Sequence, residues 1–273
     1  RDLGYEPWFD TAGAAASRQP GHLDVFGIGI DGSVWTAWKN PVEEWIDHPW
    51  VLNPNQPARP GSPIAAVSRA RDVLDIFYIN KNHEIVTQWW SPVSRDWLAN
   101  IAPITHGFAF APGTNLSATV SPTDTQRLDV FGIDWSIIVR WVQWRGGPAW
   151  TEEAVPNMAA ADPNLGVHAT HHMGELHLVV GGRDGSLNHL SHRGINHGAP
   201  HLWSLAFSLP SPGAGVRPVA VRLVSMGDLL VTVGLAANGA LFWSCWNGVT
   251  WTVPGFEFGT PSYSTQGRLA ALA

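Results

Sequence analysis

The sequence predicts an all-β fold made of repeated four-stranded antiparallel sheets, and three observations predict it. One apolar stretch, LDVFGIGIDGSVWTAW at residues 23–38, returns along the chain at intervals of 51, 54, 48, 54 and 39 residues. Its apolar side chains alternate as in a half-buried strand, and a turn splits it into two such strands. No segment shows a helical periodicity of useful length. The repeat therefore determines the architecture.

Each copy of the repeat begins at a leucine, which we call its anchor. The later copies read LDIFYINKNHEIVTQWW from 74, LDVFGIDWSIIVRWVQW from 128, LHLVVGGRDGSLNHLSH from 176 and LLVTVGLAANGALFWSCW from 229, and a fragment, GRLAALA, begins at 267. The apolar segments on either side of the turn predict the two central strands of a sheet. The anchors are Leu23, Leu74, Leu128, Leu176, Leu230 and Leu269.

Turn signals and a further tryptophan complete each unit. In four copies a turn dipeptide follows the anchor by eight residues, and Asp-Gly or Asn-Gly tolerates the positive φ of a tight hairpin. A tryptophan after the hairpin predicts an outer strand, and small or β-branched residues before the anchor predict an inner strand. The turns are Asp31-Gly32, Asn82-His83, Asp184-Gly185 and Asn238-Gly239, and the tryptophans are Trp45, Trp97, Trp150, Trp203 and Trp251.

Four short antiparallel strands in about 40–55 residues are typical of a β-propeller blade. Small side chains suit the innermost strand, because blades crowd together near the axis. Five blades are complete, and the sixth begins with SYSTQGRLAALA at the C-terminus. We expect the N-terminal DLGYEPWF, with Trp8, to complete it, because joining the chain ends removes a free edge. The prediction is a six-bladed β-propeller, closed by N- and C-terminal strands, that forms a single domain over residues 1–273.

The string LDVFGIGIDGSVWTAW, followed by Trp45, resembles the blade motif of bacterial and fungal propeller lectins of the fucose-binding type. The resemblance covers nearly the whole chain at the level of blade rhythm and implies the fold. Such lectins gain avidity by repeating one sugar site between successive blades. Here no set of an aromatic residue, an arginine and a carboxylate recurs in even three blades. We therefore expect one or two unique sites, preferably at the end of the axial channel.

Charged or aromatic residues on the inner strands are the first candidates for that site, because most inner positions carry Ala, Ser or Val. Arg69 and His171 both lie five residues before their anchors. His168 and Arg222 both lie eight before theirs, so each pair is expected at a similar height, facing one pocket. The alternative is that these side chains bond loop carbonyls between blades. The exceptions to the small-residue pattern are Arg69, His168, His171, His172, Arg222 and Tyr263.

Aromatic side chains on the hairpin strands are the second group of candidates for ligand contact. Their positions are occupied differently in each blade, which favours one individual pocket over repeated sites. The residues expected to contact a ligand are Trp35, Trp89, Trp141 and Trp243.

Metal and nucleophile chemistry receive little support. In HATHH, strand alternation puts His168 and His172 on one face and His171 on the other, and no cysteine or carboxylate cluster accompanies them, so we expect no metal. Cys245, the single cysteine, is expected to pack in an apolar strand. The aspartates that follow three anchors could form an acid–base pair, but a structural role is favoured; they are Asp24, Asp75 and Asp129.

No nucleophile elbow, P-loop or dinucleotide fingerprint is present, so no cofactor is expected. The formal net charge of −6 argues against nucleic acid or an anionic membrane as the partner, and no apolar run approaches a membrane span. The expected partner is thus a small molecule or a sugar. Two observations favour secretion: the chain starts at Arg1, and Asn115-Leu116-Ser117 is a glycosylation sequon.

Two functions from different classes fit these features. The favoured one is a cofactor-independent biosynthetic enzyme, similar to the lectin-like fungal hetero-Diels–Alderases of tropolone sesquiterpenoid pathways. A Trp-lined cavity would hold two hydrophobic reactants together, and Arg69, Arg222 or His168 would stabilise developing negative charge. The alternative is a secreted, non-enzymatic lectin for fucose or a related sugar. A purely structural propeller that docks partners on its faces is a third reading.

Overall fold

The computed structural model describes residues 13–256 apart from 43–44, 46–49, 53–54, 100–101, 106, 112, 157, 159, 194–201, 205 and 211–216. Throughout these residues the regular elements are β-strands. The described chain contains no helix that is long and apolar enough to cross a bilayer. The all-β class predicted from the repeat is confirmed.

The strands form five antiparallel sheets, and each follows the preceding one in the sequence. Blade 1 contains β1 (Ala14–Ala16), β2 (Leu23–Ile28), β3 (Val34–Lys39) and β4 (Trp50–Leu52). Blade 2 contains β5 (Ile64–Ala70), β6 (Val73–Ile79), β7 (Ile85–Ser91) and β8 (Asp96–Ala99). Blade 3 contains β9 (Ser117–Ser121), β10 (Asp124–Ile133), β11 (Val139–Arg145) and β12 (Trp150–Ala154).

Blades 4 and 5 follow the same order. Blade 4 contains β13 (Val167–His172), β14 (Glu175–Gly181), β15 (Leu187–Arg193) and β16 (Leu202–Trp203), with β17 (Phe207–Ser208) also paired to β15. Blade 5 contains β18 (Pro218–Met226), β19 (Leu229–Ala236), β20 (Leu241–Trp246) and β21 (Gly255–Phe256). The four-strand reading of each repeat therefore holds in all five described blades.

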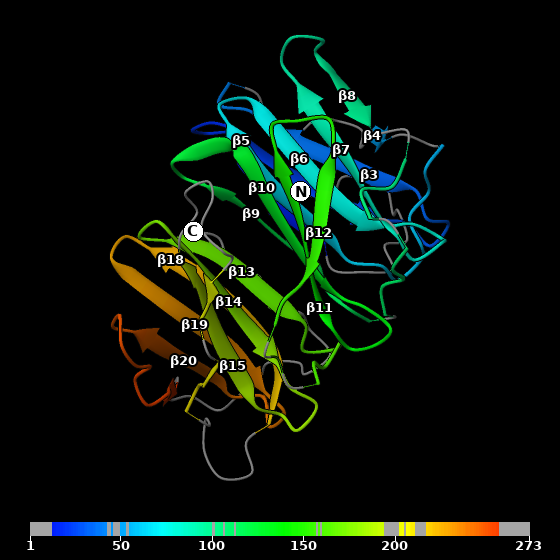
Figure 1. Ribbon diagram of the computed structural model, residues 1–273. Coiled ribbons are helices and arrows are strands. Elements are labelled where there is room, and N and C mark those ends of the chain that lie inside the picture. The colour runs from blue at the N-terminus through cyan, green and yellow to red at the C-terminus, as the bar shows by residue number, and fades with distance from the viewer. Residues whose placement is uncertain are drawn as a thin grey trace.

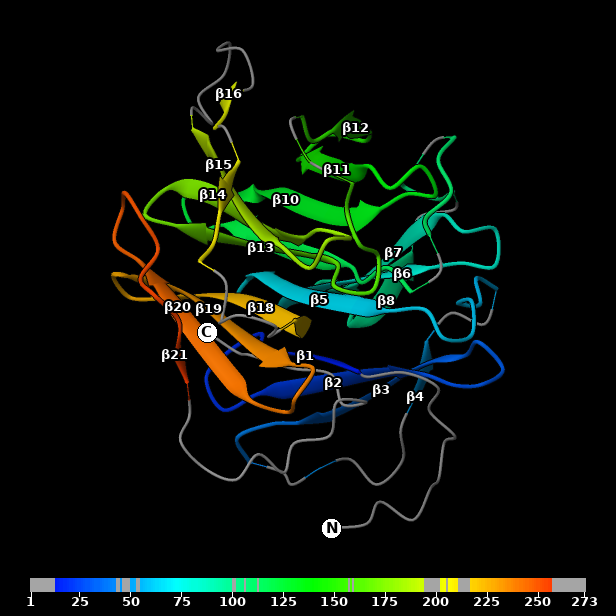
Figure 2. The ribbon, with the colours of Figure 1, turned by 90° about the horizontal axis from the view of Figure 1, so that it is seen from below.

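The blades follow one another around the molecule in chain order (Figures 1 and 2). The first strand of each blade contacts the first strand of the next, from β1 through β5, β9 and β13 to β18. This places the small-residue strands on the inside, as predicted. The sixth blade, expected from residues 262–273 and the N-terminal segment with Trp8, lies outside the described residues.

One detail of blade 1 differs from the prediction. Its outer strand carries Trp50, whereas Trp45 lies before that strand. In blades 2, 3 and 4 the outer strand carries the expected tryptophan, whereas in blade 5 Trp251 precedes β21 and forms an isolated bridge with Trp246. Trp50 takes over the packing role, because its ring meets that of Trp38 at a centroid distance of 4.8 Å.

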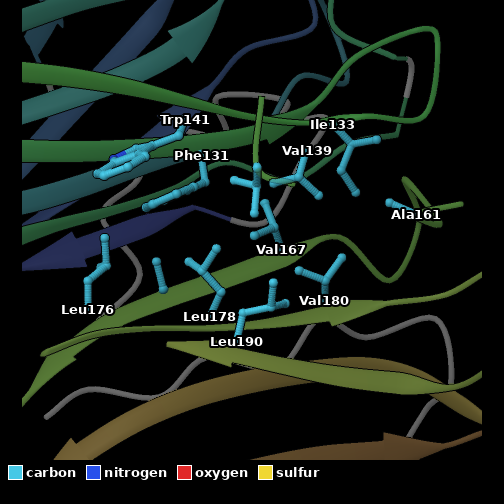
Figure 3. Packing of buried hydrophobic residues seen from close by; sticks show 12 residues of the cluster. Phe131, Ile133, Val139, Trp141, Ala161, Val167, Leu176, Leu178, Val180 and Leu190 are labelled. Carbon is cyan, nitrogen blue, oxygen red and sulfur yellow. The ribbon is translucent and has the colours of Figure 1, made fainter. Parts of the chain in front are cut away.

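The hydrophobic core lies between blades. The described sheets pack face to face, so the apolar side chains form one cluster at each contact between successive described blades. Figure 3 shows the cluster between blades 3 and 4, with Phe131 and Trp141 on one side and Leu176, Leu178 and Leu190 on the other. The repeated apolar pattern thus stabilises the packing of each blade against the next.

Candidate functional site

An arginine–aspartate pair lies beside the contact between blades 2 and 3. Arg69, near the end of β5, donates from Nε to Oδ2 of Asp75 in β6 at 2.8 Å. The side chains are 17% and 5% exposed. In the described part of the chain, neither terminal nitrogen of Arg69 has a hydrogen-bond partner. Two guanidinium donors are therefore available to a ligand.

A cavity of about 300 Å³ opens beside this pair. Its polar groups come from blade 2, and its other wall comes from blade 3. Two indole rings and a leucine make most of that wall apolar, and blade 2 adds a third indole, as in many small-molecule sites. The lining residues are Arg69, Asp75, Thr87, Trp89, Leu128, Trp144, Gly147, Pro148 and Trp150.

Trp144 fixes the orientation of the arginine from across the blade contact. The guanidinium carbon of Arg69 lies 4.8 Å from the centroid of the Trp144 ring, within cation–π range. The indole Nε1 donates to the carbonyl oxygen of Gly147 at 2.7 Å, which holds the ring in place. Arg69 is therefore held on two sides, by Asp75 and by Trp144.

The same three kinds of group meet between blades 1 and 2. Arg18 donates from Nε and Nη2 to Asp24 at 3.0 and 2.9 Å, and its guanidinium carbon lies 4.8 Å from the Trp90 ring centroid. Trp90 and Trp144 are equivalent, because each pairs with the anchor leucine of its blade. Sequence reasoning missed Arg18. The signal was present, since Arg18 and Arg69 each precede their aspartate by six residues.

The two arginines differ in how many of their nitrogens are committed. Arg18 also places Nη1 at 3.4 Å from Oδ1 of Asp72, which lies on the next turn of blade 2. All three of its guanidinium nitrogens thus face carboxylates, and its side chain is only 7% exposed. Arg69 commits only Nε among the described residues. Between blades 1 and 2 all the guanidinium nitrogens therefore have protein partners, whereas between blades 2 and 3 the terminal nitrogens of Arg69 can bind a ligand.

Asp129 occupies the corresponding position in blade 3 and is fully buried. It accepts from Arg127 Nε at 2.9 Å, Trp141 Nε1 at 2.9 Å and Arg145 Nη1 at 3.3 Å. His171 Nε2 lies 3.1 Å away. Burial raises the pKa of Asp129, but the bond to His171 and the two arginine charges outweigh burial and lower it to about 2. This carboxylate is structural and charged.

In blade 4 a histidine, His177, stands at the position of these aspartates. Its Nδ1 lies 3.0 Å from Nε2 of His189, and His172 Nδ1 lies 2.9 Å from Ser225 Oγ. Burial, followed by the neighbouring histidines, lowers the pKa of His177 to about 4. Burial and His177 lower the pKa of His189 to about 3. The contact between blades 4 and 5 therefore contains neutral imidazoles at neutral pH.

Two of the predicted catalytic residues meet on the inner strands. His168 is 4% exposed, and its Nδ1 lies 3.4 Å from Arg222 Nη1, which donates to the carbonyl of Val221 at 2.8 Å. Burial and the Arg222 charge lower the pKa of His168 to about 3. Arg69 is not part of this pair. The three predicted donors therefore do not all converge on one pocket: His168 and Arg222 lie together, whereas Arg69 bonds to Asp75 in blade 2.

The other predicted pair, Arg69 and His171, does not meet. Both have the same offset from their anchors, but Arg69 bonds to Asp75 and His171 to Asp129. The equal offset places them at equivalent points of different blade contacts, not in one pocket. Asn115, the sequon residue, donates from Nδ2 to the carbonyl of Val167 at 3.1 Å, so its amide nitrogen serves the contact between blades 3 and 4.

The predicted aromatic contacts divide into different environments. Trp89 lines the cavity, as expected for a ligand contact. Trp141 is fully buried and packs in the core, so a ligand does not reach it. Trp35 pairs with Gly27 in the sheet of blade 1, and Trp243 is 42% exposed on β20 of blade 5. Tyr263 lies outside the described residues.

A metal site and a reactive cysteine are the other chemical possibilities among the described residues. There, no group of three or more His, Cys, Asp or Glu side chains is arranged to hold a metal ion. Cys245 is partly buried in β20 and pairs with Val231, at the strand position that Trp89 has in blade 2. The cavity beside Arg69 and Asp75 is thus the best candidate site.

Comparison with known proteins identifies the fold. No family model and no curated protein matches the sequence. A lectin from Burkholderia pseudomallei superposes with a TM-score of 0.73 and 20% identity, over 93% of this chain and 72% of that chain. Aleuria aurantia lectin, in complex with a fucosylated disaccharide, gives 0.68 and 18%, over 95% and 84%. AofleA from Arthrobotrys oligospora gives 0.68 and 19%, over 93% and 72%.

These similarities cover more than nine-tenths of the chain. Aleuria aurantia lectin is described as a six-bladed β-propeller, so the predicted propeller fold is confirmed. The resemblance to propeller lectins that the blade motif suggested is therefore also found in three dimensions.

Proposed function

We propose that this protein is a carbohydrate-binding lectin that holds one neutral sugar ring of the fucose type in the cavity between blades 2 and 3. One observation carries the proposal: Arg69, whose terminal nitrogens have no hydrogen-bond partner among the described residues, lines a cavity together with a carboxylate and three indoles. A sugar needs this combination, because its hydroxyls require fixed polar partners and its C–H face suits an aromatic surface.

Each group has a distinct role in this site. The terminal nitrogens of Arg69 donate to sugar oxygens, and Asp75 accepts hydroxyl protons through charge-assisted bonds. Trp89, Trp144 and Trp150 exclude water and pack on the apolar side of the ring. Because Asp75 and Trp144 already hold Arg69, little side-chain freedom remains to be lost on binding.

The similar structures support a sugar over a hydrophobic reactant. Aleuria aurantia lectin is described in complex with α-methyl-L-fucoside, and a variant of AofleA from Arthrobotrys oligospora has three arginines replaced by alanine. The enzyme hypothesis receives no such support. Of its proposed donors, Arg69 lies beside Asp75 in blade 2, whereas His168 and Arg222 meet on the inner strands of blades 4 and 5.

The sequence implies a single site per chain. At the blade positions of Arg69 and Asp75, blade 5 has Ser225 and Val231. By the same offsets from its anchor, the sixth repeat has Ser264 and Ala270. With blade 1 saturated and blades 3 and 4 altered, only blade 2 has an arginine with free donors beside an aspartate among these positions.

A glycan array followed by calorimetric titration tests the proposal. We expect saturable binding of a neutral sugar, with α-methyl-L-fucoside as the first probe, at one site per chain. Arg69→Ala should abolish this binding, while Asp24→Asn, at the equivalent point of blade 1, should leave it within about twofold of wild type. Absence of any sugar binding, or unchanged binding by Arg69→Ala, would overturn the proposal.

A further inference from the structure

We propose that this site is acid-labile: as the medium is acidified, Asp75 takes up a proton, its ion pair with Arg69 is lost, and the sugar is released. The inference rests on the proposed function and adds its regulation. It comes from a comparison of three aspartates that share one blade position but differ in their partners.

The number of donors around each carboxylate differs sharply. Asp129 has four donor atoms within 3.3 Å, from Arg127, Arg145, Trp141 and His171. Hydrogen bonds to the charged form of a carboxylate keep it ionised, so Asp129 resists protonation.

Asp24 has an intermediate set of partners. It accepts two bonds from Arg18, and His22 Nδ1 lies 3.4 Å from its Oδ2. Asp75 accepts a single bond, from Arg69 Nε, among the described residues. Asp75 is therefore the buried carboxylate with the least compensation.

The surroundings of Asp75 add no further charge. Arg69 comes from β5, Thr87 and Trp89 from β7, and the facing wall is the uncharged surface of blade 3, made by Leu128, Trp144, Gly147, Pro148 and Trp150. Among the residues that the structure describes, Arg69 and Asp75 are the only ionisable ones that line the cavity. Burial raises the pKa of Asp75 to about 6, although the Arg69 charge and hydrogen bond oppose it. Its carboxylate is thus charged at pH 7.5 and mostly protonated at pH 5.

Protonation changes what the cavity offers to a sugar. The neutral acid has an O–H donor, where the carboxylate was acceptor only, so a sugar hydroxyl loses its charge-assisted bond to this group. The charge-assisted bond that holds Arg69 is lost at the same time. At one pH unit below the pKa only about a tenth of the molecules keep the binding form, so the apparent affinity falls about tenfold.

Calorimetric titration with α-methyl-L-fucoside at pH 7.5, 6.0 and 5.0 tests the inference. We expect affinity to fall about tenfold between pH 7.5 and pH 5.0 in the wild type and in the matched control Asp24→Asn. Asp75→Asn, which imitates the protonated acid in shape, should bind at least about tenfold more weakly at pH 7.5 and show no pH dependence. A flat wild-type profile, or a profile that persists in Asp75→Asn, would overturn the inference.

A second measurement keeps the inference separate from the proposed function. Carbon-13 NMR of the side-chain carboxyls, without sugar, should show one resonance that titrates near pH 6 and is missing in Asp75→Asn. Titration of that resonance below about pH 4.5 would overturn acid lability even if the sugar binds. Absence of sugar binding at pH 7.5 instead overturns the proposed function, whatever the resonance does.

Discussion

His171 of blade 4 lies with its Nε2 3.1 Å from Oδ2 of Asp129 in blade 3. By offset from the anchor, His171 is the equivalent of Arg18 and Arg69, which bond to the aspartate of their own blade. Blade 3 has Thr123 at that offset and so lacks the arginine, and blade 4 has His177 in place of the aspartate. Each blade has lost one half of the pair, and the remaining halves bond to each other across the blade contact.

This contact should be among the strongest polar contributions to stability. Asp129→Asn removes a charge that Arg127 and Arg145 share, and should lower the free energy of unfolding by about 3–5 kcal/mol. Urea unfolding measures the loss. Asp75→Asn serves as the comparison and should cost distinctly less, because Asp75 holds one donor. Equal losses in both variants would show that the number of donors is unimportant.

The same residue should control the acid limb of stability. The pKa of Asp129 is lowered from 3.8 to about 2, so the native state binds this proton less readily than the unfolded state. Its contribution to stability is complete above about pH 5 and is lost as the pH falls from about 4 to about 2. By pH 2 this loss amounts to about 2 kcal/mol. Melting temperatures from pH 6 to pH 2 should fall less steeply in Asp129→Asn than in wild type, and parallel curves would contradict the assignment.

Buried histidines should weaken the fold at a milder pH. The pKa of His189 is lowered from 6.5 to about 3, so it stabilises the native state above pH 6.5 and this contribution is lost as the pH falls towards 3. At pH 5 the loss is on the order of 1–2 kcal/mol. His189→Phe keeps the ring against Trp246 and Trp251 and should flatten the stability profile between pH 7 and pH 5. An unchanged profile would rule out this histidine as the cause.

Position 166 requires glycine for two reasons: its backbone has a positive φ, and a neighbouring side chain leaves no room for a Cβ. Its φ is +75°, and a Cβ there would collide with the side-chain oxygen of Asn115. Gly166→Ala should therefore destabilise the protein by more than about 2 kcal/mol, whereas Gly174→Ala, at φ +81° in open space, should show only the backbone cost of about 1 kcal/mol. Thermal unfolding of the two variants separates the clash from the backbone term.

Trp144 and Trp90 should differ in function although they are equivalent in position. Trp144→Ala removes one cavity wall and the ring that orients Arg69, and should weaken sugar binding about tenfold or more. Trp90→Ala removes the same contact from Arg18, which lies outside the cavity, and should leave sugar affinity within about twofold. Calorimetry at neutral pH compares them, and an equal loss in both would place the site elsewhere.

Much of the fold could be predicted because strand and turn signals are local. The anchors, the alternation and the turn pairs lie within one repeat, and a blade can bury its faces only against another blade. The outer strand of blade 1 was misplaced, because Trp45 and Trp50 are equally good closing tryptophans by composition. The turn of blade 3 lacked a dipeptide signal, since Ile137, at a φ of 59°, stands where blades 1, 4 and 5 have glycine and blade 2 has His83.

The candidate site was predicted only in part. Arg69 and Trp89 were named, but Asp75 was assigned a purely structural role, and Trp144 and Trp150 were not chosen as ligand contacts. Half of the cavity wall belongs to the next blade, and its residues lie more than 50 positions away from Arg69. A pattern within one repeat does not show which side chain of the following repeat will face it.

The sequence by itself determined the strands, their order within a blade and the rhythm that stacks the blades, because these depend on periodic burial within short segments. The tertiary structure alone decided which charges meet. Arg18 is saturated because Asp72 of the next blade reaches it, and His171 turns back to Asp129 because blade 4 has no aspartate of its own. Which carboxylate a given arginine or histidine contacts depends on the side chains of the neighbouring blade within a few ångströms. Those neighbours are set only when the blades pack together.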